Sequence, residues 1–134
     1  MKEPSVDLLS LRTAIEKSWK PDTANLGVEA KDNPALGQCY PTSRVIQYFF
    51  PESEIVEGDV ITPTSIEKHF WNVFLVRGGQ VHLDLTWQQF PSVSSVKTWK
   101  ILDRNNLGDS ESTMKRVELL LERVRRNLVG SRLK

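Results

Sequence analysis

The sequence contains a single cysteine among its 134 residues. One thiol excludes an internal disulfide, so cysteine usage gives no support for an oxidising compartment. Basic and acidic residues almost balance, and a net charge of +1 excludes a global attraction to nucleic acid or to an anionic membrane. No apolar stretch is long enough to span a bilayer, and residues 1–7 contain acidic side chains and a proline where a signal peptide has its apolar segment. We therefore expect a cytoplasmic protein without nucleic-acid or membrane partners.

Several sequence features of nucleotide-binding and repeat proteins are also missing. There is no internal repeat, no low-complexity tract, no Gly-rich phosphate loop and no CxxC pair. We accordingly expect no cofactor. The composition, 39% hydrophobic and 26% charged, is ordinary for a globular protein. A chain of this length forms one core, so residues 1–134 are predicted to be a single, monomeric domain.

Hydrophobic spacing predicts helices at both ends of the chain. The first is capped by Ser5 or Asp7 and ends at Pro21, and the last covers residues 110–128. Residues 24–36 lack periodicity and are predicted to form a loop. The middle of the chain favours β structure, with a short strand or irregular segment at 55–61, a loop at 62–68, a strand buried on both faces at 69–76, its return strand at 81–85 and a further strand at 96–102.

The single cysteine, Cys39, is predicted to lie at the start of a helix. Gly37 allows a tight turn just before it, Pro41 is tolerated in a first helical turn, and Pro51 ends the run that follows. A helix N-terminus presents unpaired N–H groups and the positive end of the helix dipole, and both favour a thiolate. Cys39 is therefore a candidate nucleophile. The alternative is a small buried apolar residue.

His69 and Asp84 follow Cys39 in the order expected of a Cys-His-Asp site. Each lies on a predicted strand, and the two strands are joined by a predicted hairpin. In such a site the imidazole accepts the proton of the thiol, and the carboxylate holds the imidazole in the required tautomer. The three residues are therefore the predicted catalytic set.

The predicted hairpin register leaves the partner of His69 open. A two-residue turn at 78–79 places His69 and Asp84 on one face of the sheet but sets Asp84 opposite Val73, about 13 Å along the strand from His69. Contact then requires a bulge, a longer turn or strong twist, and otherwise Gln88, opposite His69, is the better partner. We rank Asp84 first because a carboxylate stabilises an imidazolium better than an amide does.

Other polar and aromatic residues near these strands are candidates for binding a metal or the substrate. His82 could join the catalytic set in holding a metal, but the spacing lacks zinc-site regularity, so we expect a solvent-facing histidine and no metal. Trp71, Asn72 and Trp87 are predicted to line the substrate site. The alternative for the tryptophans is a place in the core or in a pocket wall.

Four motifs are distributed over most of the chain: Trp-Lys-Pro-Asp-Thr at 19–23, Gly-Gln-Cys at 37–39, His-Phe-Trp-Asn at 69–72 and Asp-Leu-Thr-Trp-Gln-Gln-Phe at 84–90. With these motifs the chain resembles the YunG-like family of small bacterial proteins. That family has no settled activity, so the resemblance indicates which proteins are related to the chain but does not indicate a reaction. The order of a cysteine on a helix and a histidine and an aspartate on successive strands is also similar to papain-like and transglutaminase-like cysteine enzymes.

The wider resemblance implies an α+β fold with a papain-like core. In that fold the nucleophile helix packs on a small antiparallel sheet, and N- and C-terminal helices flank it. Papain-like proteases place an oxyanion-hole glutamine several residues before the nucleophile, whereas Gln38 is adjacent to Cys39. We include Gln38 in the predicted catalytic set, although the backbone N–H of Cys39 is the safer oxyanion donor.

The predicted function is cysteine-dependent acyl transfer at an amide or thioester of an unknown small molecule or protein. Hydrolysis, deamidation and transfer to an amine share one acyl-enzyme, and the sequence does not distinguish them. The alternative is a catalytically silent binding or interaction domain with a buried cysteine. A third hypothesis is a toxin-like or antitoxin-like modifier of another protein.

Overall fold

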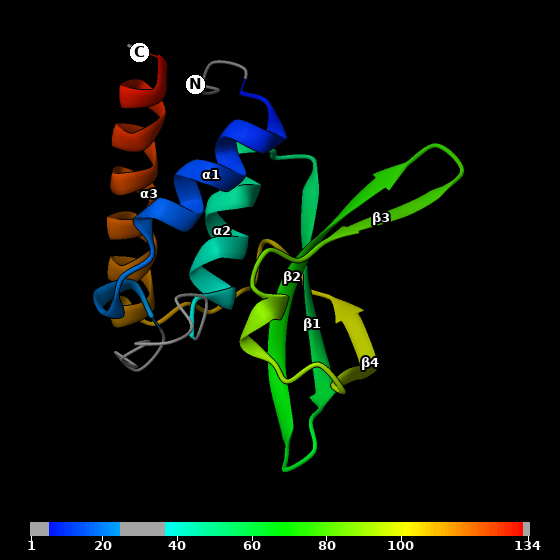
Figure 1. Ribbon diagram of the computed structural model, residues 1–134. Coiled ribbons are helices and arrows are strands. Elements are labelled where there is room, and N and C mark those ends of the chain that lie inside the picture. The colour runs from blue at the N-terminus through cyan, green and yellow to red at the C-terminus, as the bar shows by residue number, and fades with distance from the viewer. Residues whose placement is uncertain (1–5, 25–36, 133–134) are drawn as a thin grey trace.

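The computed structural model describes residues 6–24 and 37–132, with side chains as far as residue 128 (Figure 1). The helical elements are α1 (Leu8–Ser18), the short 3-10 turn η1 (Pro21–Thr23), α2 (Cys39–Phe49), the 3-10 turn η3 (Trp87–Gln89) and α3 (Glu111–Arg132). Of the predicted caps for the first helix, Asp7 is confirmed, because its Oδ1 accepts the N–H of Ser10 at 2.8 Å. Ser5 and residues 25–36 of the predicted loop lie outside the described residues. Among the helices that the structure describes, none is long and apolar enough to cross a bilayer.

The strands form one curled antiparallel sheet in the order β3-β2-β1-β4. Their bounds are β1 (Ser53–Ile61), β2 (Ile66–Val76), β3 (Gly79–Leu83) and β4 (Ser95–Ile101). Residues 55–61, predicted to be a strand or an irregular segment, belong to the internal strand β1, which pairs with both β2 and β4. The predicted loop at 62–68 is too long, because Thr62 already bonds to Ser65 and closes a tight turn before β2 begins.

The three helices lie on one side of the sheet, with α2 between the sheet and the other two helices (Figure 1). Apolar side chains from all three helices meet in the main core, which consists of Leu11, Ala14, Ile15, Trp19, Val45, Ile46, Phe49, Leu85, Leu120, Val124 and Leu128. The coarse prediction of an α+β fold, with a cysteine-bearing helix on an antiparallel sheet and a helix from each end of the chain, is confirmed.

The middle of β2 is buried on both faces, as predicted. Alternate side chains point to opposite faces of a strand. On the α2 face, Asn72 is fully buried and its Nδ2 donates to the carbonyl oxygen of Ser43 at 3.0 Å. On the other face, Trp71 and Val73 pack with Val56 of β1 in a second, smaller core. This strand therefore carries the side chains of the candidate site in a rigid setting.

The predicted turn of the β2–β3 hairpin is wrong by one residue. Val76 pairs with Gly79, so the turn residues are Arg77 and Gly78, and Gly78 adopts a φ of 92° that suits glycine. The register consequently moves by two residues, and Val73 lies opposite His82 where the prediction placed Asp84. The return strand ends at Leu83, so Asp84 lies just beyond the sheet.

Candidate functional site

Cys39 is the first residue of α2, as the sequence predicted. It is half-buried, and Gly37, with a φ of 76°, makes the turn that delivers it. The carbonyl oxygen of Gln38 accepts the N–H of Thr42 and so begins the helical hydrogen-bond pattern. The thiol thus lies where the unpaired N–H groups and the positive end of the helix dipole favour negative charge.

The imidazole of His69, on β2, is completely buried. Three aromatic rings surround it: Phe90 at 4.8 Å and edge-on, Trp71 at 5.5 Å and Trp87 at 5.9 Å between ring centroids. These rings exclude water from the imidazole and restrict its rotation. Electrostatic interactions at His69 are therefore stronger than they would be in solvent.

Asp84 is the partner of His69. Its Oδ2 lies 2.6 Å from His69 Nε2, and its Oδ1 accepts hydrogen bonds from the backbone N–H and the hydroxyl of Thr86 at 3.2 and 3.3 Å. Gln88, the other candidate, is exposed on η3. The contact forms because the register differs from the predicted one and because the chain leaves the sheet at this point.

Opposing effects determine the protonation of His69. Burial is the largest single effect and lowers its pKa, but the hydrogen bonds and negative charges of Asp84 and Cys39 together outweigh burial and raise the pKa from 6.5 to about 9. The thiol of Cys39 lies near enough to the imidazole to contribute to this shift. The three predicted catalytic residues are therefore brought together. At neutral pH the ring of His69 is protonated on both nitrogens and carries a positive charge.

The side chain of Gln38 forms its hydrogen bonds with residues at η1 and not with the candidate site. It is buried, its Nε2 donates to the carbonyl oxygen of Lys20 at 2.9 Å, and its Oε1 accepts the hydroxyl of Thr23 at 2.8 Å. These bonds tie the start of α2 to η1. We therefore keep only the backbone N–H of Cys39 as the expected oxyanion donor.

The predicted substrate-lining residues are divided between the two faces of the sheet. Trp71 and Trp87 lie against His69, and Trp71 is buried with its Nε1 donating to His82 Nδ1 at 2.8 Å. Asn72 is on the opposite face and bonds to α2. Trp71 and Asn72 therefore belong to the interior, and Trp87, which is half-buried, is the one of the three that reaches the surface beside the imidazole.

His82 is exposed, as predicted, yet its ring is engaged. Besides accepting from Trp71, it packs edge-on against Trp99 of β4 at 4.9 Å. Within residues 6–24 and 37–128, no three side chains of the metal-binding types come together as a candidate metal site.

Sequence reasoning missed the role of Gln89 in this site. Its Nε2 lies 3.4 Å from His69 Nδ1, and its Oε1 accepts the N–H of Gly37 at 3.3 Å. The strand register had singled out Gln88 instead. Alternation along a strand could not locate Gln89, because residues 87–89 form the turn η3 and no longer follow strand periodicity.

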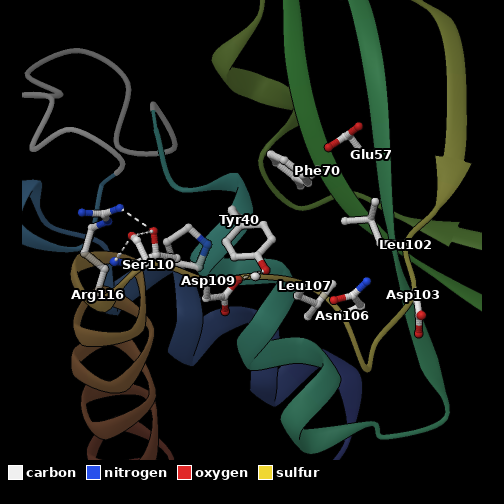
Figure 2. Close-up of a pocket in the computed structure, with 13 residues that line it drawn as sticks. Tyr40, Glu57, Phe70, Leu102, Asp103, Asn106, Leu107, Asp109, Ser110 and Arg116 are labelled. Carbon is white, nitrogen blue, oxygen red and sulfur yellow. Dashed lines mark hydrogen bonds between the residues drawn. The ribbon is translucent and has the colours of Figure 1, made fainter.

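A pocket of about 420 Å³ borders the site, between the first turn of α2, the sheet and the segment that leads into α3 (Figure 2). One wall is an edge-on pair formed by Tyr40 and Phe70, which directly follow Cys39 and His69 in the chain. Its charged lining residues are Glu57, Asp103, Asp109 and Arg116. This pocket was not predictable from the sequence, since most of its lining comes from residues 102–116, which lack a motif.

Asp109 joins the segment before α3 to two residues of α2. The hydroxyl of Tyr40 donates to its Oδ1 (Figure 2). Arg44 Nε lies 2.9 Å from its Oδ2. Burial raises the pKa of Tyr40, and the hydrogen bond to Asp109 raises it further. Tyr40 is therefore a neutral hydrogen-bond donor at any physiological pH.

These observations define an α+β protein in which a cysteine at a helix N-terminus, a buried histidine and an aspartate converge next to a pocket. A family model described as YunG protein matches residues 7–129, and the chain belongs to this family. The match covers every described helix and strand apart from the end of α3. No curated protein and no solved structure matches the chain.

Proposed function

We propose that the protein is a cysteine-dependent acyl-transfer enzyme that acts on an amide or a thioester. The observation that carries the proposal is the buried His69, which is bonded to Asp84 through Nε2 and interacts with Cys39 at the start of α2. A solvent-excluded imidazole that is bonded to a carboxylate and lies beside a thiol is the arrangement that nucleophilic catalysis by cysteine requires.

The mechanism assigns a separate step to each residue. With Nε2 bonded to Asp84, Nδ1 of His69 is the nitrogen that takes the thiol proton of Cys39. The thiolate attacks the substrate carbonyl carbon, and the backbone N–H of Cys39 donates to the oxygen that becomes negative. His69 then gives its proton to the leaving amine or thiol, and the acyl group stays on sulfur. Water or an amine, deprotonated by His69, releases the acyl group and restores the thiol.

The neighbouring pocket offers room for a side group of the substrate. Tyr40, which directly follows Cys39 in the chain, and Phe70 supply its aromatic surface. Three carboxylates and one guanidinium line it, so we place a neutral or positively charged group there.

The first test is the rate at which iodoacetamide alkylates Cys39 in the folded protein as a function of pH. Ordinary thiols have a pKa of about 8.5 and are almost entirely protonated at pH 6.5. We expect Cys39 to react at pH 6.5 at least about tenfold faster than it does in the urea-unfolded chain. His69→Gln should abolish this advantage, whereas His82→Gln, the matched histidine control, should keep it.

The competing function is a catalytically silent binding domain. The observation that favours it is the complete burial of His69, which restricts access of substrate and water to the base. Alkylation of Cys39 only after unfolding, or at a rate indifferent to His69→Gln, would refute the enzyme proposal and favour this one. Given a reactive thiol, incubation with simple thioesters and mass spectrometry of the intact chain should detect an acyl group on Cys39.

A further inference from the structure

The side chain of Gln89 lies between the two halves of the proposed site. One end of its amide approaches His69 Nδ1 at 3.4 Å, and the other accepts the N–H of Gly37 at 3.3 Å. Gly37 makes the turn that delivers Cys39. A single amide thus contacts both the imidazole and the backbone that carries the thiol.

Two backbone groups determine which way this amide faces. The N–H of Gly37 can bond only to the amide oxygen, and the carbonyl oxygen of Thr86 can accept only from the amide nitrogen, which it does at 3.2 Å. An amide rotated by 180° would lose both bonds, because its N–H groups would face the N–H of Gly37 and its oxygen would face the carbonyl oxygen of Thr86. The nitrogen of Gln89 is therefore the atom that faces His69.

This orientation selects one tautomer of His69. An amide N–H that donates to Nδ1 requires a lone pair there, and an ionised Asp84 accepts only, which requires a proton on Nε2. Both contacts are thus satisfied by the same neutral imidazole. A proton on Nδ1 would bring two donors together, so Gln89 opposes the imidazolium that Asp84 and Cys39 favour. Asp84 and Cys39 are the titratable groups whose charges act on His69, and the rings packed on it are uncharged.

We propose that Gln89 is a positioning residue that keeps His69 in the tautomer whose Nδ1 is unprotonated, and that weakens the hold of the imidazole on the proton that Nδ1 takes from Cys39. The inference rests on the proposed function, in which His69 must give up that proton to the leaving group. It assigns Gln89 no contact with substrate. A base that bound the proton too tightly would be a poor acid in the next step.

Nitrogen NMR of the two histidine rings tests this directly, because ring nitrogen shifts report both tautomer and protonation. His82→Gln identifies the His69 signals. In the wild type at pH 10 we expect neutral His69 to carry its proton on Nε2. In Gln89→Met, which keeps the side-chain length and removes the amide, the titration midpoint of His69 should rise by about half a pH unit or more. Gln89→Glu should raise it further, since a carboxylate stabilises the imidazolium.

The matched control is Gln80→Met, at an exposed glutamine on the β2–β3 hairpin, which projects away from the helices (Figure 1). It should leave the titration of His69 unchanged, and amide exchange at Gly37 should accelerate in Gln89→Met but not in the control. A proton on Nδ1 in the wild type, or a midpoint that falls or stays constant in Gln89→Met, would overturn the inference. If Gln89→Met does not fold, the wild-type tautomer and the Gln89→Glu titration still decide it. Slow alkylation of Cys39 would refute the proposed enzyme but would leave these ring signals readable.

Discussion

Nε2 of His69 and Oδ2 of Asp84 lie 2.6 Å apart, although β3 ends one residue before Asp84. Because the chain leaves the sheet there, the carboxylate no longer follows the spacing of the strand and turns toward the imidazole. Its second oxygen is held by Thr86, which fixes the direction of the first. The pairing of base and carboxylate thus depends on the end of a strand.

Asp84→Asn tests the charge of this pair with little change in shape. Loss of the negative charge should lower the titration midpoint of His69 and reduce the rate of Cys39 alkylation at pH 6.5 by about tenfold, because the imidazolium that accompanies the thiolate is less stable. Ring nitrogen NMR and alkylation kinetics measure the two effects. Glu118→Gln, at an exposed glutamate on α3 outside the pocket, is the control and should change neither.

The stability of the fold should depend on pH through His69. Its pKa is raised from 6.5 to about 9 on folding, so the folded chain binds this proton more tightly than the unfolded chain does. The resulting stabilisation, roughly 3 kcal/mol at most, is complete below pH 6.5 and is lost as the pH rises through about 9. Urea unfolding at pH 6, 7.5 and 9.5 should show this decline in the wild type and in His82→Gln. An equal decline in His69→Gln would assign it to other groups.

Gly58→Ala should destabilise the second, smaller core. A Cβ at position 58 would lie 2.5 Å from Cη2 of Trp71 and 3.0 Å from the carbonyl oxygen of Thr98. Because the indole is held by its bond to His82, we expect a loss of about 1–3 kcal/mol in the free energy of unfolding. Urea denaturation measures it. Gly79→Ala, where an added Cβ meets nothing within 4 Å, should change stability by much less, and equal losses would show that the clash is relieved.

Tyr40 should resist ionisation in the folded protein. The chain has two tyrosines, so Tyr48→Phe leaves Tyr40 as the sole phenol to be followed by ultraviolet absorbance. We expect its pKa to lie above the value of about 10 for an exposed tyrosine, because it is buried and donates to Asp109. Adding Asp109→Asn should lower that pKa. Ionisation of Tyr40 at an ordinary pH in the folded state would contradict this account of the pocket.

Local signals in the sequence sufficed to locate the proposed nucleophile, Cys39, and the proposed base, His69. Gly37 and Pro41 bracket the start of α2, and their backbone preferences act within one turn of the helix. The aromatic run that begins at His69 has apolar groups on both faces, which indicates a doubly buried strand wherever the strand lies. Such features depend only on residues that are neighbours in the chain, so they can be predicted from the sequence.

Features that depend on distant residues were not predictable in the same way. Both 77–78 and 78–79 contain glycine and can form a two-residue turn, and the choice between them moves every pair in the hairpin. The contacts of Gln38 and Gln89 join segments far apart in the sequence. The pocket likewise requires residues near 57, 70 and 109 to meet, which no local pattern encodes.

The turn at Arg77 and Gly78 also has a consequence for how this chain can change over evolutionary time. Side chains alternate along β3, so a register slip of one residue would turn His82 and the chain end that leads to Asp84 toward the opposite face of the sheet. A slip of two residues would carry the carboxylate about 7 Å along the strand. Substitutions of the exposed Arg77 should be tolerated. Changes in the number of residues that separate His69 from Asp84 should not be tolerated. Insertions and deletions at this solvent-exposed tip should therefore be selected against as strongly as substitutions in the interior.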